Sequence, residues 1–313
     1  MFGKKSLTKI VFSLVLILGF SLASCTSDTA VPEDAQTDDA AQTLRIALLM
    51  PEDATFFKTI EEGASEAANR LKAELIIREA KNDLATQNEQ IQEMIDQGVD
   101  AIVITAVDGA GVADKINAAA AAGIAVLSVD RSIESDAIVS HIASDNVAGG
   151  KMAGDYLAEL LGNEGNVVEL EGIEGTSAAQ DRGAGFNEAI AAYPNITVVV
   201  KEVANFNRQE GHDVFAQILA DNPKIAGVFA HNDEMILGAI TAAEEAGRLR
   251  DIRFMGFDSV DDAIAALETG SLAGTIAQQP AEMGRLGIEN AVKHLQGETI
   301  PETIAVDLAL VTH

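Results

Sequence analysis

The strongest constraint on the fold of this chain is an alternation of short apolar runs with longer amphipathic stretches, which begins at Leu44. Apolar runs of about 4–8 residues are typical of buried strands, and amphipathic stretches of about ten or more are typical of the helices between them. A repeated strand–helix order indicates βαβ units with parallel sheets. The sequence therefore predicts a fold of the α/β class.

The alternation is interrupted once, which indicates two successive lobes. After an extended run, Ile138–Ala143, the side chain of Asp145 and its neighbours can cap a new helix, Val147–Leu161, and the strand–helix order starts again. A last helix, Ala281–Leu295, and a last strand, Ile304–Val311, are left over. Periodicity alone assigns neither of them to a lobe. The length of the chain from Leu44 onward also suits two domains better than one.

Residues 1–24 have the features of an export signal. Three lysines among the first nine residues precede an apolar run, Ile10–Leu22, which is too short to span a membrane and is followed by small residues. The sequence L-A-S-C ending at Cys25 resembles the bacterial lipobox, in which the cysteine is lipidated and becomes the mature N-terminus. Because Cys25 is the sole cysteine, no intrachain disulfide is possible. We expect an exported protein, lipid-anchored through Cys25 at the cell envelope, in the periplasm or at the outer face of the cytoplasmic membrane.

The segment 25–43 is acidic and nearly free of bulky apolar side chains, so we expect a flexible tether there. The formal net charge of the whole chain is −28, and removing the signal takes away three lysines and no acid, which leaves −28 − 3 = −31. Such acidity argues against nucleic acid or an anionic membrane as a direct partner. The membrane is therefore expected to be contacted only through the lipid anchor.

Polar and aromatic residues follow several of the predicted strands or begin the adjacent helices. In open parallel sheets, ligands bind outside the carboxyl ends of the strands. Asp130 and Arg131 come directly after the strand Ala125–Val129, and a carboxylate beside a guanidinium suits a neutral ligand with several hydroxyl groups. One such residue is commonplace on a solvated surface, but a set of them along the same edge predicts a binding cleft. The set is Phe56, Phe57, Asp130, Arg131, Arg182, Phe206, Asn207, Asn232, Asp233, Asp258 and Gln278.

Five long segments, in order along the chain, resemble the bacterial periplasmic ribose-binding proteins. They are Val139–Leu157, Gly172–Phe186, Phe229–Ile240, Gly256–Ser259 and Gly274–Pro280. That family supplies the sugar-binding component of ABC transporters and has the type I periplasmic-binding fold, with two doubly wound parallel-sheet lobes and a three-segment hinge. The resemblance implies one lobe from 44–144 with 279–307 and a second from 145–278 with 308–313, which places the spare helix in the first lobe.

The resemblance also implies that nine residues of this set, all except Asn207 and Asp233, are the sugar contacts. Aromatic rings can cover the C–H faces of a monosaccharide, while carboxylates accept and arginines donate hydrogen bonds to its hydroxyls. Ala54 departs from the family, which usually has Asn at this position, two residues before Phe56. Either Asp53 takes the place of the Asn side chain, or one hydrogen bond to the sugar is missing. The expected ligand is ribose or a similar pentose or hexose.

We expect the lobes to close on the sugar and to present the closed form to an ABC permease, with the protein acting as a monomer. The alternative is a sugar sensor that presents the closed form to a chemoreceptor or sensor kinase. A transcription regulator of the same fold would need an N-terminal helix-turn-helix and a basic face, which this chain lacks.

An enzyme is not expected, because no nucleophile, phosphate-loop or zinc-protease motif occurs. Asp130 and Asp258 could form a glycosidase pair, but each is expected to have an arginine or hydroxyl partner and to stay ionised, which leaves no general acid. The five histidines are scattered without ligand spacing. We therefore predict no metal site and no cofactor.

Overall fold

The computed structural model describes residues 43–221 and 224–313, which form two six-stranded sheets. The predicted signal peptide, Cys25 and all but the last residue of the predicted tether lie outside the described residues. Within the described part of the chain, no helix is both long enough and apolar enough to cross a membrane.

The first sheet has the strand order β11-β5-β4-β3-β1-β2, with every neighbouring pair parallel. Its strands are β1 (Arg45–Met50), β2 (Glu74–Glu79), β3 (Ala101–Ile104), β4 (Ala125–Val129), β5 (Ile138–Ser144) and β11 (Thr303–Val306). The helices packed on it are α1 (Thr55–Leu71), α2 (Leu84–Gln97), α3 (Ala113–Ala121) and α9 (Pro280–Leu295). We call this sheet with its helices the first lobe.

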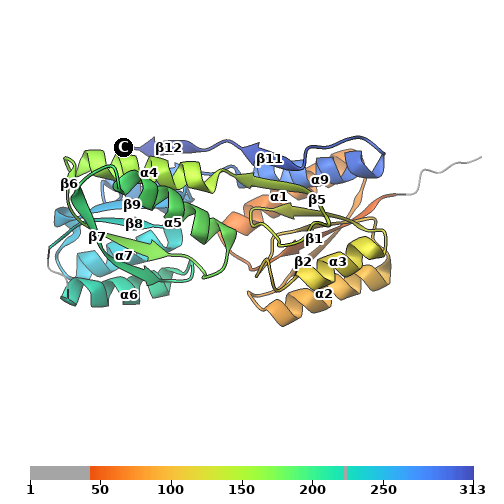
Figure 1. Ribbon diagram of the computed structural model, residues 1–313, viewed down its shortest axis with the longest axis horizontal. Helices are drawn as coiled ribbons and strands as arrows, with labels where there is room; N and C mark the ends of the chain where they lie inside the picture. Colours follow the sequence, from red (N-terminus) through yellow and green to blue (C-terminus); the bar gives the residue numbers. More distant parts are fainter. Residues whose placement is uncertain (1–42, 222–223) are drawn as a thin grey trace, which may run out of the picture. The chain divides into compact units, whose positions relative to one another are not determined.

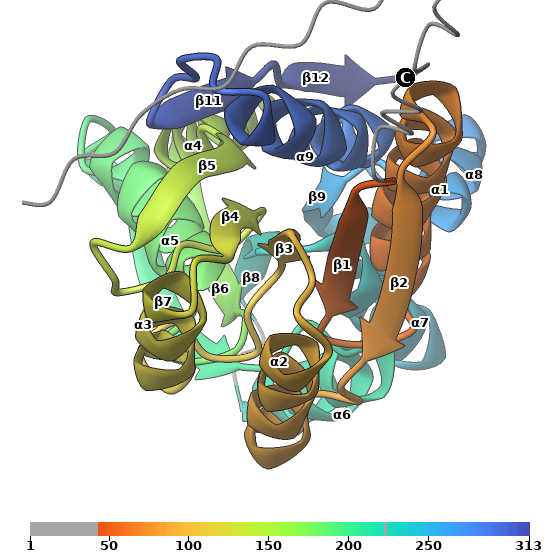
Figure 2. The same cartoon turned by 90° about the vertical axis from the view of Figure 1, so that its right-hand side faces the viewer.

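Helices cover both faces of the first sheet, with α1 and α9 on one face and α2 and α3 on the other (Figure 2). Every residue of the central strands β3 and β4 is buried. Continuous apolar strands of this kind are what a sheet covered on both faces requires. The predicted amphipathic helices therefore pack against the predicted apolar strands, as expected for a doubly wound sheet.

The second sheet has the strand order β12-β10-β9-β8-β6-β7. Its strands are β6 (Glu164–Glu171), β7 (Asn195–Val203), β8 (Ile225–Ala230), β9 (Arg253–Asp258), β10 (Gly274–Ala277) and β12 (Ala309–Thr312). Its helices are α4 (Asn146–Leu160), α5 (Ser177–Ile190), α6 (Arg208–Asp221), α7 (Asp233–Glu245) and α8 (Asp261–Thr269), with a short 3₁₀ helix at Leu249–Asp251. We call this sheet with its helices the second lobe; Figure 1 shows the two sheets with their helices.

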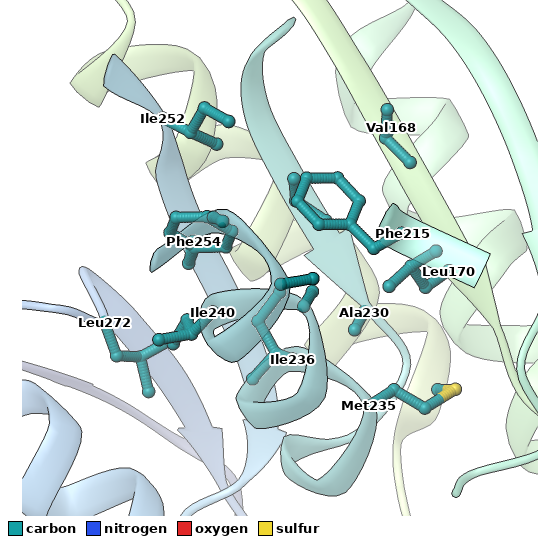
Figure 3. Packing of buried hydrophobic residues seen from close by; sticks show 14 of the residues in the cluster. Val168, Leu170, Phe215, Ala230, Met235, Ile236, Ile240, Ile252, Phe254 and Leu272 are labelled. Atoms are coloured by element: carbon teal, nitrogen blue, oxygen red, sulfur yellow. The ribbon is translucent and has the colours of Figure 1, made fainter. Parts of the chain in front are cut away.

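The second lobe also has a core on each face of its sheet. On one face, Phe215 of α6 packs edge-on against Phe254 of β9, with ring centroids 6.0 Å apart. Figure 3 shows this cluster, in which Ile236 and Ile240 of α7 fill the space beside the two rings. On the other face, α4 and α5 cover a separate apolar cluster. Each lobe thus has its own buried apolar core.

The chain passes between the two sheets three times: from β5 to α4, from β10 to α9 and from β11 to β12. At the first passage, the Asp145 side chain accepts a hydrogen bond from the Ala148 amide, which is the predicted cap. At the last passage, the prediction of one strand over Ile304–Val311 is wrong. The run divides because β11 pairs with β5 of the first sheet, whereas β12 pairs with β10 of the second.

The strand β12 runs antiparallel to β10, so the second sheet is mixed rather than wholly parallel. Between β11 and β12, the Leu308 side chain packs against the core of the second lobe, and the Asp307 carbonyl accepts a hydrogen bond from Gln279 Nε2. One continuous strand can pair within only one sheet. The two residues between β11 and β12 interrupt the strand, so the end of the chain pairs with both sheets.

Candidate functional site

A cavity of about 470 Å³ lies at the carboxyl ends of strands from both sheets, and its wall includes all nine residues predicted as sugar contacts. The first lobe contributes Phe56, Phe57, Asp130 and Arg131, and the second contributes Arg182, Phe206, Asn232, Asp258 and Gln278. Carboxyl ends of parallel strands in two sheets thus face one shared space. That arrangement brings residues up to 222 positions apart, Phe56 and Gln278, into one site.

The aromatic part of the first-lobe wall comes from the first turn of α1. The Phe56 and Phe57 rings meet edge to face with centroids 5.4 Å apart, and Phe57 is buried while Phe56 is partly exposed. The neighbouring Ala54 also lines the cavity and adds no side-chain hydrogen-bonding group. The Asp53 carboxylate is exposed and lies 2.9 Å from Lys58 Nζ. It therefore pairs with a surface lysine at the cavity rim.

Asp130 and Arg131 follow β4 directly, and both are only 4% exposed. Arg131 Nη1 donates to the Ala106 carbonyl at 3.1 Å, and the guanidinium carbon lies 5.4 Å from the Phe57 ring centroid and 5.8 Å from that of Phe206. These are cation–π distances. Phe57 and Phe206 belong to different lobes, so the Arg131 guanidinium is within cation–π distance of one ring from each lobe.

Arg182, in the second turn of α5, is held by three acceptors. Its Nε donates to Asn146 Oδ1 at 2.9 Å, and its Nη1 donates to the His231 carbonyl at 2.6 Å and lies 3.4 Å from Asp258 Oδ1. Its guanidinium carbon is 3.9 Å from the Phe257 ring centroid. A planar cation with fixed donors is thereby pre-oriented at the cavity wall.

Asp258 ends β9, and Gln278 directly follows the neighbouring strand β10. Gln278 Nε2 donates to Asp258 Oδ1 at 2.7 Å. Two buried atoms of the wall, Gln278 Oε1 and Arg131 Nε, have no hydrogen-bond partner in the described structure. Buried polar atoms are nearly always paired. Arg131 Nε lies 3.8 Å from Asp130 Oδ2, an ion pair that is longer than a hydrogen bond. An acceptor and a donor without hydrogen bonds at one cavity suit a ligand that both donates and accepts them.

Burial opposes the ionisation that the sequence predicts for Asp130 and Asp258. Burial raises the pKa of Asp258 to about 7, and the nearby Arg182 and the hydrogen bond from Gln278 only partly oppose this shift. Burial also raises the pKa of Asp130, against the opposing effect of Arg131 and Arg182. Desolvation outweighs the arginines because these carboxyl groups are almost completely removed from water.

Asn232 has a structural part in addition to its place in the wall. Its Oδ1 accepts from the Met235 amide and so caps α7, while its Nδ2 lies 3.3 Å from the Phe206 carbonyl and donates to it. The ring of Phe206 packs against Gly172, where an added Cβ would lie 2.1 Å from the ring Cζ atom. Gly172 therefore leaves the space that the Phe206 ring occupies.

Three of the nine non-glycine residues with positive φ in the described part of the chain line the cavity. Asp130, Phe206 and Asp258 have φ values of 65°, 57° and 116°, in the region that residues other than glycine rarely adopt. Each such residue costs of order 1–3 kcal/mol and persists only where its neighbours enforce it. Three such turns each present a side chain to one cavity, which makes this cavity the candidate functional site.

No pattern in the sequence identified the residues whose contacts hold the cavity side chains in position. Asn146 and His231 hold Arg182 from behind, and Arg208 at the rim pairs with Glu234 and Asp262. Only the tertiary fold brings these residues into contact with their partners, and no spacing in the sequence predicts the pairs. Among the described residues, no group of three or more His, Cys, Asp or Glu side chains could hold a metal ion.

Comparison with known proteins agrees with this fold. Residues 46–299 match the family model described as "Periplasmic binding protein domain". The chain is 36% identical over 308 residues to the ribose import binding protein of Haemophilus influenzae, which covers 98% of this chain and 99% of that protein. It is 40% identical over 256 residues to the ribose import binding protein of Escherichia coli K12, and the aligned region covers 82% of this chain and 86% of that protein.

A solved structure gives the same result. The ABC transporter periplasmic solute-binding protein of Actinobacillus succinogenes with bound D-allose has a TM-score of 0.82 and 32% identity, and the match covers 86% of this chain and 98% of that one. The predictions of the type I periplasmic-binding fold and of a binding protein rather than an enzyme are confirmed by these relatives. The chain belongs to the periplasmic binding protein family, whose members are extracytoplasmic solute-binding proteins with two α/β lobes.

Proposed function

We propose that this protein captures a neutral monosaccharide, ribose or a similar pentose or hexose, between its two lobes and delivers it to an ABC permease. The observation that carries the proposal is the composition of the cavity wall: aromatic rings from both lobes, with carboxyl, guanidinium and amide groups between them. Such a wall matches a molecule with apolar C–H faces and a rim of hydroxyls. The relatives that bind ribose and the neighbour with bound D-allose support the same ligand class.

The charges of the wall favour an uncharged ligand. The cavity is lined by five carboxyl groups, those of Glu52, Asp53, Asp130, Glu234 and Asp258, against three arginines, and burial raises the pKa of Asp130 and Asp258. A sugar phosphate or sugar acid would add a negative charge to this acidic site, and repulsion between like charges would oppose its binding. Hydroxyls, by contrast, can donate to the carboxylates and to Gln278 Oε1, and can accept from the arginines.

Closure of the lobes would follow from where the contacts lie. We assign residues 44–144 with 279–307 to the first lobe and 145–278 with 308–313 to the second, joined by the three passages of the chain. A ligand that touches both Phe57 and Phe206 gains its full set of contacts only when the lobes approach, so binding favours the closed form. Lipidation at Cys25 and an acidic tether would keep the closed protein near its permease.

The proposal is tested by a thermal-shift screen of pentoses and hexoses on the soluble form that begins at Thr26. The true ligand should stabilise the fold by about 2.7 kcal/mol at a hundredfold excess over Kd. Asp130→Ala and Arg182→Ala should abolish the shift, since each removes an ionic group of the wall, whereas Asp136→Ala in an exposed loop should retain it. A screen in which no sugar shifts the parent, or in which both wall variants respond like the parent, would refute the proposal.

A further inference from the structure

His231 directly follows β8 and is buried behind the cavity wall. Its main-chain amide donates to the Leu170 carbonyl at 3.0 Å, and its own carbonyl accepts from Arg182 Nη1 at 2.6 Å. Both ring nitrogens also have partners. Nδ1 lies 3.3 Å from the Gly172 amide nitrogen, and Nε2 lies 3.0 Å from Glu169 Oε1. Each of the four polar groups of His231 therefore contacts a different residue.

The partner of the Nε2 atom is a buried carboxyl group that acts as an acceptor. Glu169 of β6 is completely buried, and its oxygens accept from Asn187 Nδ2 of α5 at 2.9 Å and lie 2.9 Å from Lys201 Nζ of β7. An amide NH₂ group and an ammonium group can only donate. The same carboxylate is therefore available to accept from His231 Nε2, which requires a hydrogen on that nitrogen.

The partner of the Nδ1 atom fixes the other side of the ring. A main-chain amide can only donate, so the Gly172 amide requires a lone pair on Nδ1 of His231. A ring that was protonated on both nitrogens would direct a second hydrogen at the Gly172 amide hydrogen. The two contacts therefore select one form of the ring, the neutral imidazole with its hydrogen on Nε2.

Gly172 in turn sets where the Phe206 ring lies. The ring packs so closely on Gly172 that an added Cβ would be 2.1 Å from its Cζ atom. The residue after His231, Asn232, reaches the same aromatic residue from another side, because its Nδ2 donates to the Phe206 carbonyl at 3.3 Å. The two residues after β8 thus hold Phe206 by its main chain and, through Gly172, by its ring.

The His231 ring also belongs to the interior of the second lobe, since its centroid lies 5.5 Å from that of the buried Phe229 ring. The contribution to stability and the contact at the wall use different atoms. Nε2 contacts Glu169 in the interior, whereas Nδ1 contacts Gly172 behind the cavity. A substitution that keeps an acceptor near Nδ1 and removes the group at Nε2 therefore separates the two contributions.

We propose that His231 is a positioning residue for two sugar contacts. Through Nδ1 of the neutral ring it fixes Gly172 and thereby the Phe206 ring, and through its carbonyl it orients Arg182. The role toward the sugar rests on the proposed function. The form of the ring is a property of the unliganded protein and is tested without a sugar.

The first experiment determines the form of the ring by NMR on unliganded protein labelled with ¹⁵N at its histidines, near neutral pH. A long-range ¹⁵N–¹H correlation spectrum distinguishes ring nitrogens with and without a hydrogen, and the signals missing from His231→Asn assign the spectrum. We expect His231 to have an unprotonated Nδ1 and a protonated Nε2. A hydrogen on Nδ1, in either a neutral or a charged ring, would overturn the proposal.

The second experiment measures the affinity for the best sugar of the screen by titration calorimetry, with His231→Asn and His231→Leu as a matched pair. Both side chains are too short to replace the contact with Glu169, but asparagine can place Oδ1 near the position of Nδ1 and accept from the Gly172 amide. We expect His231→Asn to bind within about threefold of the parent and His231→Leu to bind about tenfold or more weakly. His313→Asn, at the exposed end of the chain, controls for the loss of a histidine and should bind like the parent.

A double-mutant cycle tests whether the effect passes through the Phe206 ring. In a Phe206→Ala background there is no ring to misplace, so the difference in Kd between the leucine and asparagine variants should fall to about twofold or less. A difference that stays near tenfold would overturn the proposal, as would equal affinity of the two variants in the parent background.

Two outcomes need a separate reading. If His231→Leu does not fold, His231→Asn decides the case, and a tenfold loss of affinity in that variant would overturn the positioning role. If the parent itself binds no sugar, the proposed function fails, while the NMR experiment still decides whether His231 holds Gly172 through Nδ1.

Discussion

Replacing Gly172 with alanine should weaken sugar binding although it removes no atom and no charge. The added Cβ would lie 2.1, 2.4 and 2.5 Å from three carbons of the Phe206 ring. Carbon atoms prefer a separation of about 3.5–4.0 Å, so the ring must move by about 1.5 Å. Gly172 lies behind the ring, and the space available to it is the cavity itself. The displaced ring would therefore occupy part of the volume that a sugar needs.

The magnitude follows from what Phe206 contributes. A well-placed aromatic contact is worth roughly 0.5–1.5 kcal/mol beyond the area it buries. A ring displaced by more than 1 Å should lose most of this and some apolar burial, for a total of about 1–2 kcal/mol, or roughly a 5- to 30-fold rise in Kd. The unliganded fold should lose less than this, because Phe206 is only partly buried and its ring can move.

Titration calorimetry with the best sugar of the screen measures the affinity, and thermal denaturation of the unliganded protein measures the cost to the fold. A double-mutant cycle supplies the control: in a Phe206→Ala background the alanine at 172 has no ring to displace, so its effect on Kd should vanish. The reasoning fails if Gly172→Ala binds like the parent, or if its cost is unchanged when Phe206 is absent.

Two further predictions concern pH. Asp258 has a pKa near 7 in the folded protein and a usual value of 3.8, so the stability of the parent relative to Asp258→Asn should fall as pH rises from about 4 to 7 and then level off, as measured by denaturant unfolding. Glu169 is the opposite case: burial opposes its ionisation, but His231, Lys201 and Asn187 outweigh that and lower its pKa. Glu169→Gln should cost about 1–3 kcal/mol at pH 7, with a deficit that shrinks as pH falls below about 4.5, and an equal deficit at pH 3 would contradict this account.

The strand–helix alternation was enough to predict most of the fold, because buried parallel strands must be apolar on both faces and their helices on one. The strand Ala125–Val129 was predicted with its observed bounds, and the Asp145 cap holds α4 as expected. The division of the last strand was not predictable in this way. Whether the residues after α9 pair with β5 or β10 depends on which sheet edge lies within reach, and periodicity carries no information about that.

The candidate site, like the fold, was predictable from the sequence only in part. Residue type at strand ends, together with the family resemblance, named nine side chains that the fold places around one cavity. Sequence could do this because strand direction alone sets which end of a βα unit faces a ligand. It could not give the protonation of Asp258, because that depends on how completely the folded chain removes the carboxyl from water.

The local chemistry of the chain thus determined its class of fold, its lobes and the kind of ligand its strand ends can hold. Tertiary structure alone decided which residues support that site from behind. Gly172 directly follows β6 and His231 directly follows β8, and each acts by contact with a residue distant in the sequence. Such contacts arise only when the two lobes pack their sheets and helices, so no pattern along the chain encodes them directly.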